Sequence, residues 1–331
     1  MTTTLPPRQI FAEHAHRPPV RVITPPPRPD VPGLVRRDEI DTPELRERLS
    51  DGTLVRVAPG LLGTMQPDQP AWRRLEAEHL LRVRAVLVRL WTDFSFSHET
   101  AALLWGCWSW CLGPAVHLTQ LTVPSMPPDL RFPLRRHGHA LTSADRTDVD
   151  GVPVTSLERT VLDCLCSLPA ERGLVIADSA LRAGADLDSL RERADAWTGR
   201  RGIRVARKVL ALADIEAESA GESRTRWQLA VGGLPRPVLA IPVETFLGWR
   251  WVDLGWPELK VGIEFDGAIK YSGGGYGDPG RRLFEEKRRH DALVEAGWIL
   301  IRVTWADLAH PERLVARVRA ALAAARRRTF R

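Results

Sequence analysis

Cysteine is scarce in this sequence, with only four in 331 residues, and long apolar runs are missing. The scarcity of cysteine argues against a secreted disulfide scaffold and predicts a protein of the reducing cytoplasm. The most apolar stretch, 101–116, is interrupted by Gly106, Gly113 and Pro114. It therefore falls short of the roughly 20 residues that a membrane-spanning helix needs. The N-terminus also lacks the apolar core of a secretory signal, so we expect a cytoplasmic protein without a membrane partner.

Lysine is scarce too, because only Lys208, Lys260, Lys270 and Lys287 occur and arginine supplies most of the positive charge. The formal net charge is +6, and the segment 311–331, with seven arginines and one acidic residue, carries as much by itself. A basic terminal segment is typical of proteins that contact phosphate backbones. A solvated helix face explains the same pattern, and both interpretations stay open.

With 44% hydrophobic and 27% charged residues, the chain can bury a large core and is long enough for two or three domains. The order of its expected helices and strands predicts an α/β fold class. Shifts in pattern divide the chain into five segments. They are a proline-rich disordered arm at 1–32, an abbreviated winged-helix-like segment at 33–70, a mostly helical α+β middle domain at 71–216, an α/β domain at 217–310 and a basic C-terminal helix at 311–331.

The segment 33–70 is predicted to contain one helix and a basic hairpin. Asp41 and Pro43 are typical of a helix start, Gly52 ends the helix, and the run 54–61 alternates like a short hairpin. This order is typical of the end of a winged helix-turn-helix, whose basic residues face DNA. The candidate nucleic-acid contacts are Arg46, Arg48 and Arg56. The alternative is a small helix and hairpin that only pack on the next domain.

The middle domain offers no metal motif by spacing. Its four cysteines are Cys107, Cys111, Cys164 and Cys166. They lack the paired spacing of zinc sites, and their apolar surroundings predict buried structural thiols. Its scattered histidines are His98, His117, His137 and His139. None of them has the sequence spacing of a metal site or a catalytic triad.

The region 217–308 is the most informative one. Its pattern predicts a helix, three strands, a helix, a strand and a final helix, in that order. The expected ranges are 222–231 for the first helix, 238–245, 249–254 and 260–266 for the three strands, 282–296 for the second helix and 298–303 for the last strand.

Acidic residues interrupt two of these strands. Asp253 lies in the second strand, and Glu264 and Asp266 lie two apart in the third, so both side chains leave the same face. Burying unpaired carboxylates is costly, so these three should meet cations or lie at an open end of the sheet. Converging carboxylates suit Mg²⁺, and a bound Mg²⁺ can activate water against a phosphodiester. A hydrolytic site is therefore a candidate.

Each of these acids also has a structural interpretation. Ser219 and Glu222 form the S-x-x-E pattern of a capping box, in which Glu222 only satisfies the helix start. Glu264 is within cross-strand reach of Lys260 or Arg250 for an ordinary ion pair. Three acids at the expected strand positions nevertheless favour a metal site, or the relic of one.

Arginines near the start of the following helix are candidates for binding phosphate. They are Arg281, Arg282, Arg288 and Arg289. Glu285 lies four residues before Arg289, so an ion pair along the helix is the alternative for Arg289. The glycine-rich loop 271–280 is either a flexible substrate loop or a simple connection.

Several motifs of this region together resemble the Vsr-like (very-short-patch-repair-like) branch of the PD-(D/E)XK nuclease superfamily. They are Glu222, Val252-Asp253-Leu254, Ile263-Glu264-Phe265-Asp266-Gly267, Arg288 before Leu293, Gly297 to Thr304, and Asp307-Leu308. The resemblance covers about the last third of the chain. It implies a restriction-endonuclease-like αβββαβ fold and a magnesium-dependent endodeoxyribonuclease.

The resemblance also assigns roles to residues. Asp253 matches the metal-binding Asp, Glu264 the second metal ligand, and Glu222 the acid on the preceding helix. Asp266 stands where many members have Lys, and Lys270 stands where Vsr-like chains usually have His. Lys270 is therefore the candidate for a migrated catalytic lysine, and a decayed site is the alternative.

Upstream motifs resemble actinobacterial proteins grouped with the AbiEi-type antitoxins of type IV toxin-antitoxin systems. The motifs lie at 54–60, 97–102 and 154–163. This resemblance implies DNA binding, repression of the protein's own operon and a cognate toxin as partner. The sequence therefore predicts a DNA-interacting protein with a nuclease domain for repair or defence, and its alternative is a non-catalytic antitoxin and transcriptional repressor.

Overall fold

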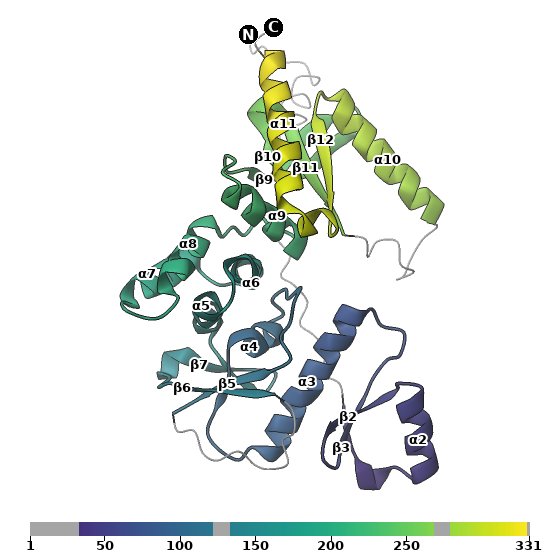
Figure 1. Ribbon diagram of the computed structural model, residues 1–331, viewed down its shortest axis with the longest axis vertical. Coiled ribbons are helices and arrows are strands. Elements are labelled where there is room, and N and C mark those ends of the chain that lie inside the picture. Colours follow the sequence, from purple (N-terminus) through teal and green to yellow (C-terminus); the bar gives the residue numbers. More distant parts are fainter. Residues whose placement is uncertain (1–32, 122–132, 268–278, 330–331) are drawn as a thin grey trace, which may run out of the picture. The chain divides into compact units, whose positions relative to one another are not determined.

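The computed structural model describes residues 33–121, 133–267 and 279–329, without the side chains of 279–283 and 329 (Figure 1). The arm at 1–32 and Lys270 lie outside the described residues. The described chain divides into an N-terminal unit within Pro25–Ile215 and a C-terminal unit within Glu216–Arg331. Each unit mixes helices and strands, which confirms the α/β class.

The N-terminal unit begins with a small antiparallel sheet. Its elements are β1 (Leu34–Arg36), α2 (Thr42–Ser50), β2 (Leu54–Ala58) and β3 (Leu61–Thr64), with strand order β1-β3-β2. The Asp41 carboxylate accepts a 2.8 Å hydrogen bond from the Glu44 amide and caps α2. Leu45 of α2 packs with Leu54 and Leu62 of the sheet. The predicted helix and hairpin are therefore confirmed.

A long helix and a five-stranded sheet follow. The helix is α3 (Ala71–Arg89), and the strands are β4 (Ser95–Phe96), β5 (Val116–Gln120), β6 (Leu134–Gly138), β7 (Arg146–Val149) and β8 (Val152–Thr155). The strand order is β6-β5-β4-β8-β7, with parallel pairing of β5 with β6 and of β4 with β8. The remaining helices are α4 (His98–Leu104), α5 (Leu157–Ser167), α6 (Ala170–Arg182), α7 (Leu187–Ala196) and α8 (Ile203–Leu212).

The C-terminal unit has the element order that the sequence predicts. Its elements are α9 (Ala220–Val231), β9 (Val238–Thr245), β10 (Gly248–Trp256), β11 (Val261–Asp266), α10 (Pro279–Glu295), β12 (Ile299–Thr304) and α11 (Pro311–Thr329). The sheet order is β12-β11-β10-β9. Strands β9, β10 and β11 form an antiparallel meander. Strand β12 follows the helical crossover through α10 and runs parallel to β11.

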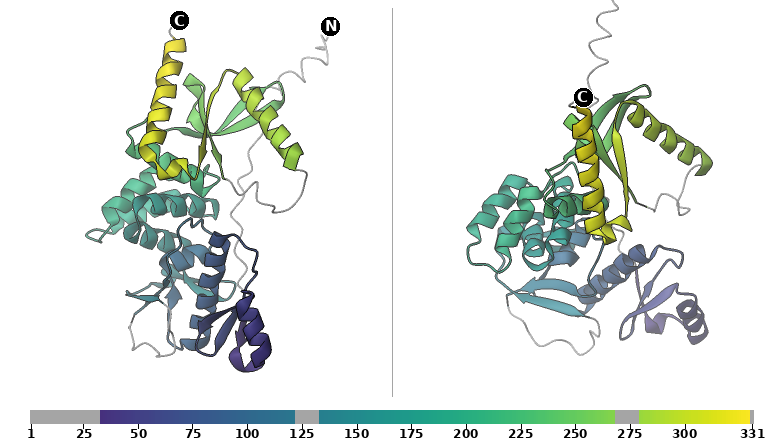
Figure 2. Two further views of the ribbon diagram at one scale, coloured as in Figure 1. Left: turned by 45° about the vertical axis from the view of Figure 1, so that its right-hand side comes forward. Right: turned by 45° about the horizontal axis from the view of Figure 1, so that its top comes forward.

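Both faces of this sheet are covered by helices (Figures 1 and 2). The larger core packs Ile263 and Val303 of the sheet with Val318 of α11. On the other face, a smaller cluster joins Leu293, in α10, to Ile241 of β9. A sheet sandwiched in this way leaves polar groups room only at its rims and at strand ends.

Two observations bear on the expectations from composition. Among the described residues, no helix is both long and apolar enough to span a membrane. Cys107 and Cys164 are buried as expected, but Cys111 is exposed, so the prediction of a buried thiol is wrong there. Cys111 falls in the irregular stretch after α4, where apolar neighbours in sequence do not enclose it.

Candidate functional site

The acids of β11 lie on the side of the sheet that faces α10. Val261, Ile263 and Phe265 alternate into the larger core, so Glu264 and Asp266 leave the opposite face. Both acids are partly exposed. Glu264 stands beside Arg302 of β12 in the parallel register. The period-two prediction for the two acids is therefore confirmed.

Asp253 joins this face from β10. The antiparallel pairing of β10 with β11 runs from Trp256 and Val261 to Leu254 and Ile263. At the next position, Asp253 Oδ2 accepts a 2.8 Å hydrogen bond from the Phe265 amide. The carboxylate thus takes the place of a backbone acceptor as the strands separate, which fixes its position beside Glu264.

Arg289 of α10 holds the two carboxylates together. Its Nη2 lies 3.1 Å from Glu264 Oε1 and 4.0 Å from Asp253 Oδ1, and it donates a 2.8 Å hydrogen bond to the Trp251 carbonyl. The approach to Glu264 Oε1 lacks hydrogen-bond geometry, so this buried oxygen has an ion pair but no hydrogen bond. His290 Nδ1 lies 3.9 Å from the other oxygen of Glu264.

The expected partners of Glu264 along the hairpin bond elsewhere. Lys260 Nζ donates to the Ala296 carbonyl at 3.0 Å, and Arg250 donates to the Trp249 carbonyl at 2.7 Å. The signal for Arg289 was present in the sequence, because it precedes the fully buried Leu293 by four residues and so shares the inward face of α10. His290, its neighbour, carried no such signal.

Ser219 caps α9, as the S-x-x-E pattern predicts, because its hydroxyl accepts a 3.2 Å hydrogen bond from the Glu222 amide. The carboxylate of Glu222 binds the amide of Glu218 in place of the predicted amide of Ser219. Its Oε1 accepts a hydrogen bond from the Ser219 hydroxyl at 2.8 Å, and its Oε2 accepts one from the Glu218 amide at 2.9 Å. Burial, together with the nearby charge of Asp253, raises the pKa of Glu222 to about 8. Glu222 therefore lies close enough to Asp253 for the two carboxyls to interact.

A glycine allows this close approach of α9 to the sheet. A Cβ at Gly221 would stand 2.0 Å from the ring of Phe265. No side chain fits at that distance, so the start of α9 lies directly against β11. The structure thus brings together Glu222, Asp253 and Glu264, which are far apart in the sequence.

The other predicted residues of this domain stand apart or are not described. Asp266 is partly exposed at the end of β11, beside Thr304 of β12. Lys270 lies outside the described residues, and the side chains of Arg281 and Arg282 are likewise outside them. Arg288 is exposed, and its guanidinium lies 5.9 Å from the ring centre of Phe284.

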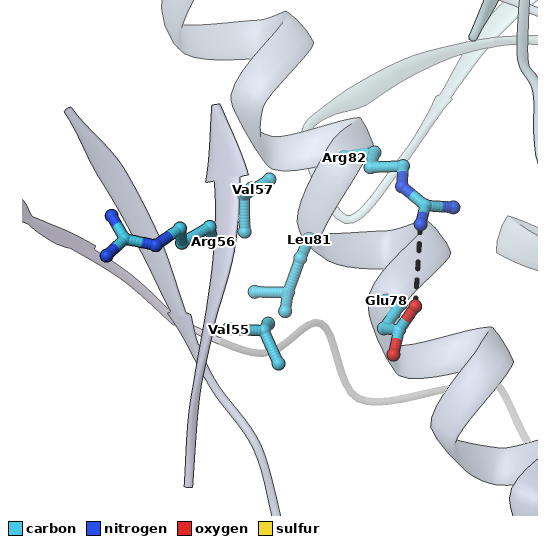
Figure 3. Close-up of a pocket in the computed structure, with 6 residues that line it drawn as sticks. All are labelled: Val55, Arg56, Val57, Glu78, Leu81 and Arg82. Atoms are coloured by element: carbon cyan, nitrogen blue, oxygen red, sulfur yellow. Dashed lines mark hydrogen bonds and ion pairs between the residues drawn. The ribbon is translucent and has the colours of Figure 1, made fainter. Parts of the chain in front are cut away.

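The predicted DNA contacts of the N-terminal unit are on its surface. Arg46 and Arg56 are exposed, and Arg48 pairs with Glu44 at 3.0 Å. Arg56 borders a shallow pocket between β2 and α3, where it points away from α3 (Figure 3). On the far side of this pocket, Arg82 pairs with Glu78 along α3.

The middle of the N-terminal unit contains a cluster that sequence spacing missed. Among the described residues, one set of three metal-ligating side chains has its ligand atoms within 4.8 Å of one another, and it consists of His98, His117 and His137. These three histidines are far apart in the sequence but meet in the folded unit, so the prediction that they are scattered is wrong. No set of three acids meets the same distance within the described part of the C-terminal unit.

No family model matches the chain. The protein is similar to uncharacterized protein Rv2248 of Mycobacterium tuberculosis (strain ATCC 25618 / H37Rv), with 31% identity over 286 residues, which are 83% of this chain and 94% of that protein. Uncharacterized protein MT2308 of strain CDC 1551 / Oshkosh shows the same identity and coverage. A match of this length includes residues of both units.

Proposed function

The chain belongs to one family with these two mycobacterial proteins, and we propose that it is a cytoplasmic DNA-interacting protein with a Vsr-like nuclease domain. In this proposal the C-terminal unit has a restriction-endonuclease-like fold and hydrolyses phosphodiesters with the help of Mg²⁺. The observation that carries the proposal is that Glu222, Asp253 and Glu264, from α9, β10 and β11, come close to one another in the folded unit.

The donor set fits a hard divalent cation. Glu264 Oε1 is buried without a hydrogen bond, and Asp253 Oδ1 faces the same guanidinium nitrogen. The space between Glu264 Oε1 and Asp253 Oδ1 therefore already holds a positively charged group. Mg²⁺ is commonly held by one or two carboxylates and completes its shell with water and substrate phosphate. The Arg289 side chain is 38% exposed, so it has room to move aside for the ion.

The proposed roles follow from these contacts. Asp253 and Glu264 hold the ion, and the hydrogen bond from the Phe265 amide keeps Asp253 in position. When bound, Mg²⁺ supplies a water of lowered pKa and stabilises negative charge on the phosphate. Glu222 helps to orient water beside Asp253, and Lys270 supplies positive charge to the transition state. Arg289, once displaced, binds the incoming phosphate.

A cleavage assay tests this function. Purified protein is incubated with duplex, mismatched and single-stranded DNA, with Mg²⁺ or with a chelator. We expect Mg²⁺-dependent cutting that Asp253→Ala abolishes. The matched control is Asp291→Ala, which removes an exposed acid from α10 and should cut like the wild type. Cutting that survives Asp253→Ala would reveal a contaminating nuclease and remove the proposal's support.

A second candidate function is a non-catalytic AbiEi-like antitoxin or transcriptional repressor. The observation that favours it is the neutralisation of both carboxylates by Arg289, together with the hydrogen bonds of Glu222 at the start of α9. In this case the surface arginines Arg46 and Arg56 contact operator DNA. Absence of cutting on all three substrates, with salt-sensitive binding to the protein's own promoter, would favour the repressor.

A further inference from the structure

Three histidines from three separate elements meet in the N-terminal unit. His98 is the first residue of α4, directly after β4, while His117 lies in β5 and His137 in β6. The sheet order places β5 between β4 and β6. The Ser97 amide donates to the His117 carbonyl at 3.1 Å, so the start of α4 is tied to β5. The cluster is thus held by the sheet itself.

The three rings have the spacing of a metal site that is nearly formed. His137 Nε2 lies 3.2 Å from His117 Nδ1, and the ring of His98 stacks on that of His137 with centres 3.7 Å apart. Nitrogen ligands around a tetrahedral Zn²⁺ at its usual bond length stand about 3.3 Å apart. The His117–His137 distance already has this value, and rotation of the rings brings the third nitrogen in.

The backbone at His98 is held in an unfavourable conformation. Its φ is +52°, in the left-handed region that residues other than glycine rarely adopt. Such strain persists where the surrounding structure enforces it, and it is concentrated at functional sites. Here it directs a 95% buried imidazole onto the other two rings, since His98 is only 5% exposed.

Neighbouring hydroxyl groups bind the ring of His98 and the backbone of His117. His98 Nδ1 lies 3.0 Å from the Ser97 hydroxyl, which also accepts a 2.9 Å hydrogen bond from the Thr119 hydroxyl. The Thr100 hydroxyl accepts from the His117 amide at 2.8 Å. A hydrogen bond at one ring nitrogen leaves the other free to ligate, as is usual around metal-binding histidines.

The charges around the cluster allow a cation to enter. Four arginines act electrostatically on the rings. Arg159 and Arg200 are paired with the buried Asp163, and Arg172 with the buried Glu99, so their positive charge is largely balanced. The fourth, Arg135, is exposed, so water screens its charge. Imidazole binds metal in its neutral form.

We propose that His98, His117 and His137 form a binding site for Zn²⁺ with three imidazole ligands. Zinc fits better than Mg²⁺ or Ca²⁺, because imidazole suits zinc and related transition metals whereas the hard ions prefer oxygen. Three protein ligands leave the fourth position to water or an anion. The site belongs to the N-terminal unit and stands whether or not the C-terminal unit cuts DNA.

Metal binding by the full-length protein tests this site. Protein freed of metal with a chelator is titrated with Co²⁺, whose visible absorption reports tetrahedral coordination, and then with Zn²⁺ in competition. We expect one ion per chain in the wild type. His137→Asn and His117→Asn should each weaken binding by at least about tenfold. The matched control is His139→Asn, which changes an exposed histidine two residues away and should bind like the wild type.

Thermal unfolding shows whether each variant is folded. Zn²⁺ should raise the Tm of the wild type and of His139→Asn, because a ligand that binds only the folded state stabilises it. The Tm of folded His137→Asn should not respond. Folded wild-type protein that binds no Zn²⁺ at micromolar concentration would overturn the proposal. So would equal Zn²⁺ affinity in the wild type and His137→Asn, since the three rings would then be a hydrogen-bonded core cluster only.

Discussion

The two units of this protein handle clustered ionisable groups in opposite ways. In the C-terminal unit, Asp253 and Glu264 share Arg289 as a counter-ion. In the N-terminal unit, three histidines lie against one another, two of them buried and His137 partly exposed, and desolvation lowers the pKa of each ring. Carboxylates favour hard cations such as Mg²⁺, whereas imidazoles favour transition metals such as Zn²⁺. If both proposals hold, one chain therefore separates two metals by ligand chemistry.

The largest expected effect comes from the acid that balances the arginines near the histidines. Asp163 has a fully buried side chain and binds Arg159 at 2.9 Å and Arg200 at 2.7 Å. Asp163→Ala leaves the buried Arg159 undercompensated, which should cost about 3 to 5 kcal/mol of unfolding free energy. Urea unfolding measures the loss. The control Asp188→Ala removes the 83% exposed partner of Arg191 and should cost about 0.5 kcal/mol or less.

The next effect concerns the pH dependence contributed by Glu222. Its folded pKa, about 8, lies above the ordinary value of 4.5, so the folded state binds the extra proton. Its contribution to unfolding free energy therefore falls as pH rises from about 4.5 to 8, by at most about 5 kcal/mol. Urea unfolding across this range should show a shallower fall in Glu222→Gln. An unchanged pH slope would contradict the raised pKa, and Glu258→Gln, at an exposed acid, is the control.

A smaller effect tests whether Arg289 stands in for a cation. Arg289→Ala removes the shared counter-ion of Asp253 and Glu264 and should cost about 1 kcal/mol, since the pair is partly exposed. Millimolar Mg²⁺ should then raise the Tm of Arg289→Ala more than that of the wild type. Arg288→Ala, at the exposed neighbouring position, should respond like the wild type. No difference between the two variants would show that the carboxylates do not bind the ion.

The mildest test extends the same desolvation argument to the thiols of the N-terminal unit. Burial raises the pKa of Cys107 to about 12, and Cys164 is buried as well. Cys111 is exposed. Iodoacetamide at pH 8, followed by mass spectrometry of peptides, should therefore label Cys111 well before Cys107 and Cys164. Equal labelling of all three in the folded protein would contradict the burial that also lowers the pKa of the histidines.

Sequence patterns predicted much of the C-terminal unit because the relevant signals are local. Alternation in β11 placed Glu264 and Asp266 on one face, and the Ser219–Glu222 pattern placed the cap. Arg289 was expected to bind phosphate or Glu285, and its pairing with Asp253 and Glu264 was missed. Arg289 reaches β10 and β11 only after the crossover through α10 folds back. Local periodicity predicts which face of a strand or helix a side chain lies on. It does not predict which residue of the neighbouring layer that side chain contacts.

The amino-acid sequence by itself determined the helices and strands, the alternation that turns Ile263 and Glu264 to opposite faces of the sheet, and the absence of a paired cysteine motif. Tertiary structure alone decided that His98, His117 and His137 meet, since this depends on the parallel pairing of β5 with β6 and on the turn from β4 into α4. The hydrophobic period can be read from neighbouring residues in the sequence. Strand register and crossover geometry are fixed only when distant segments pack together.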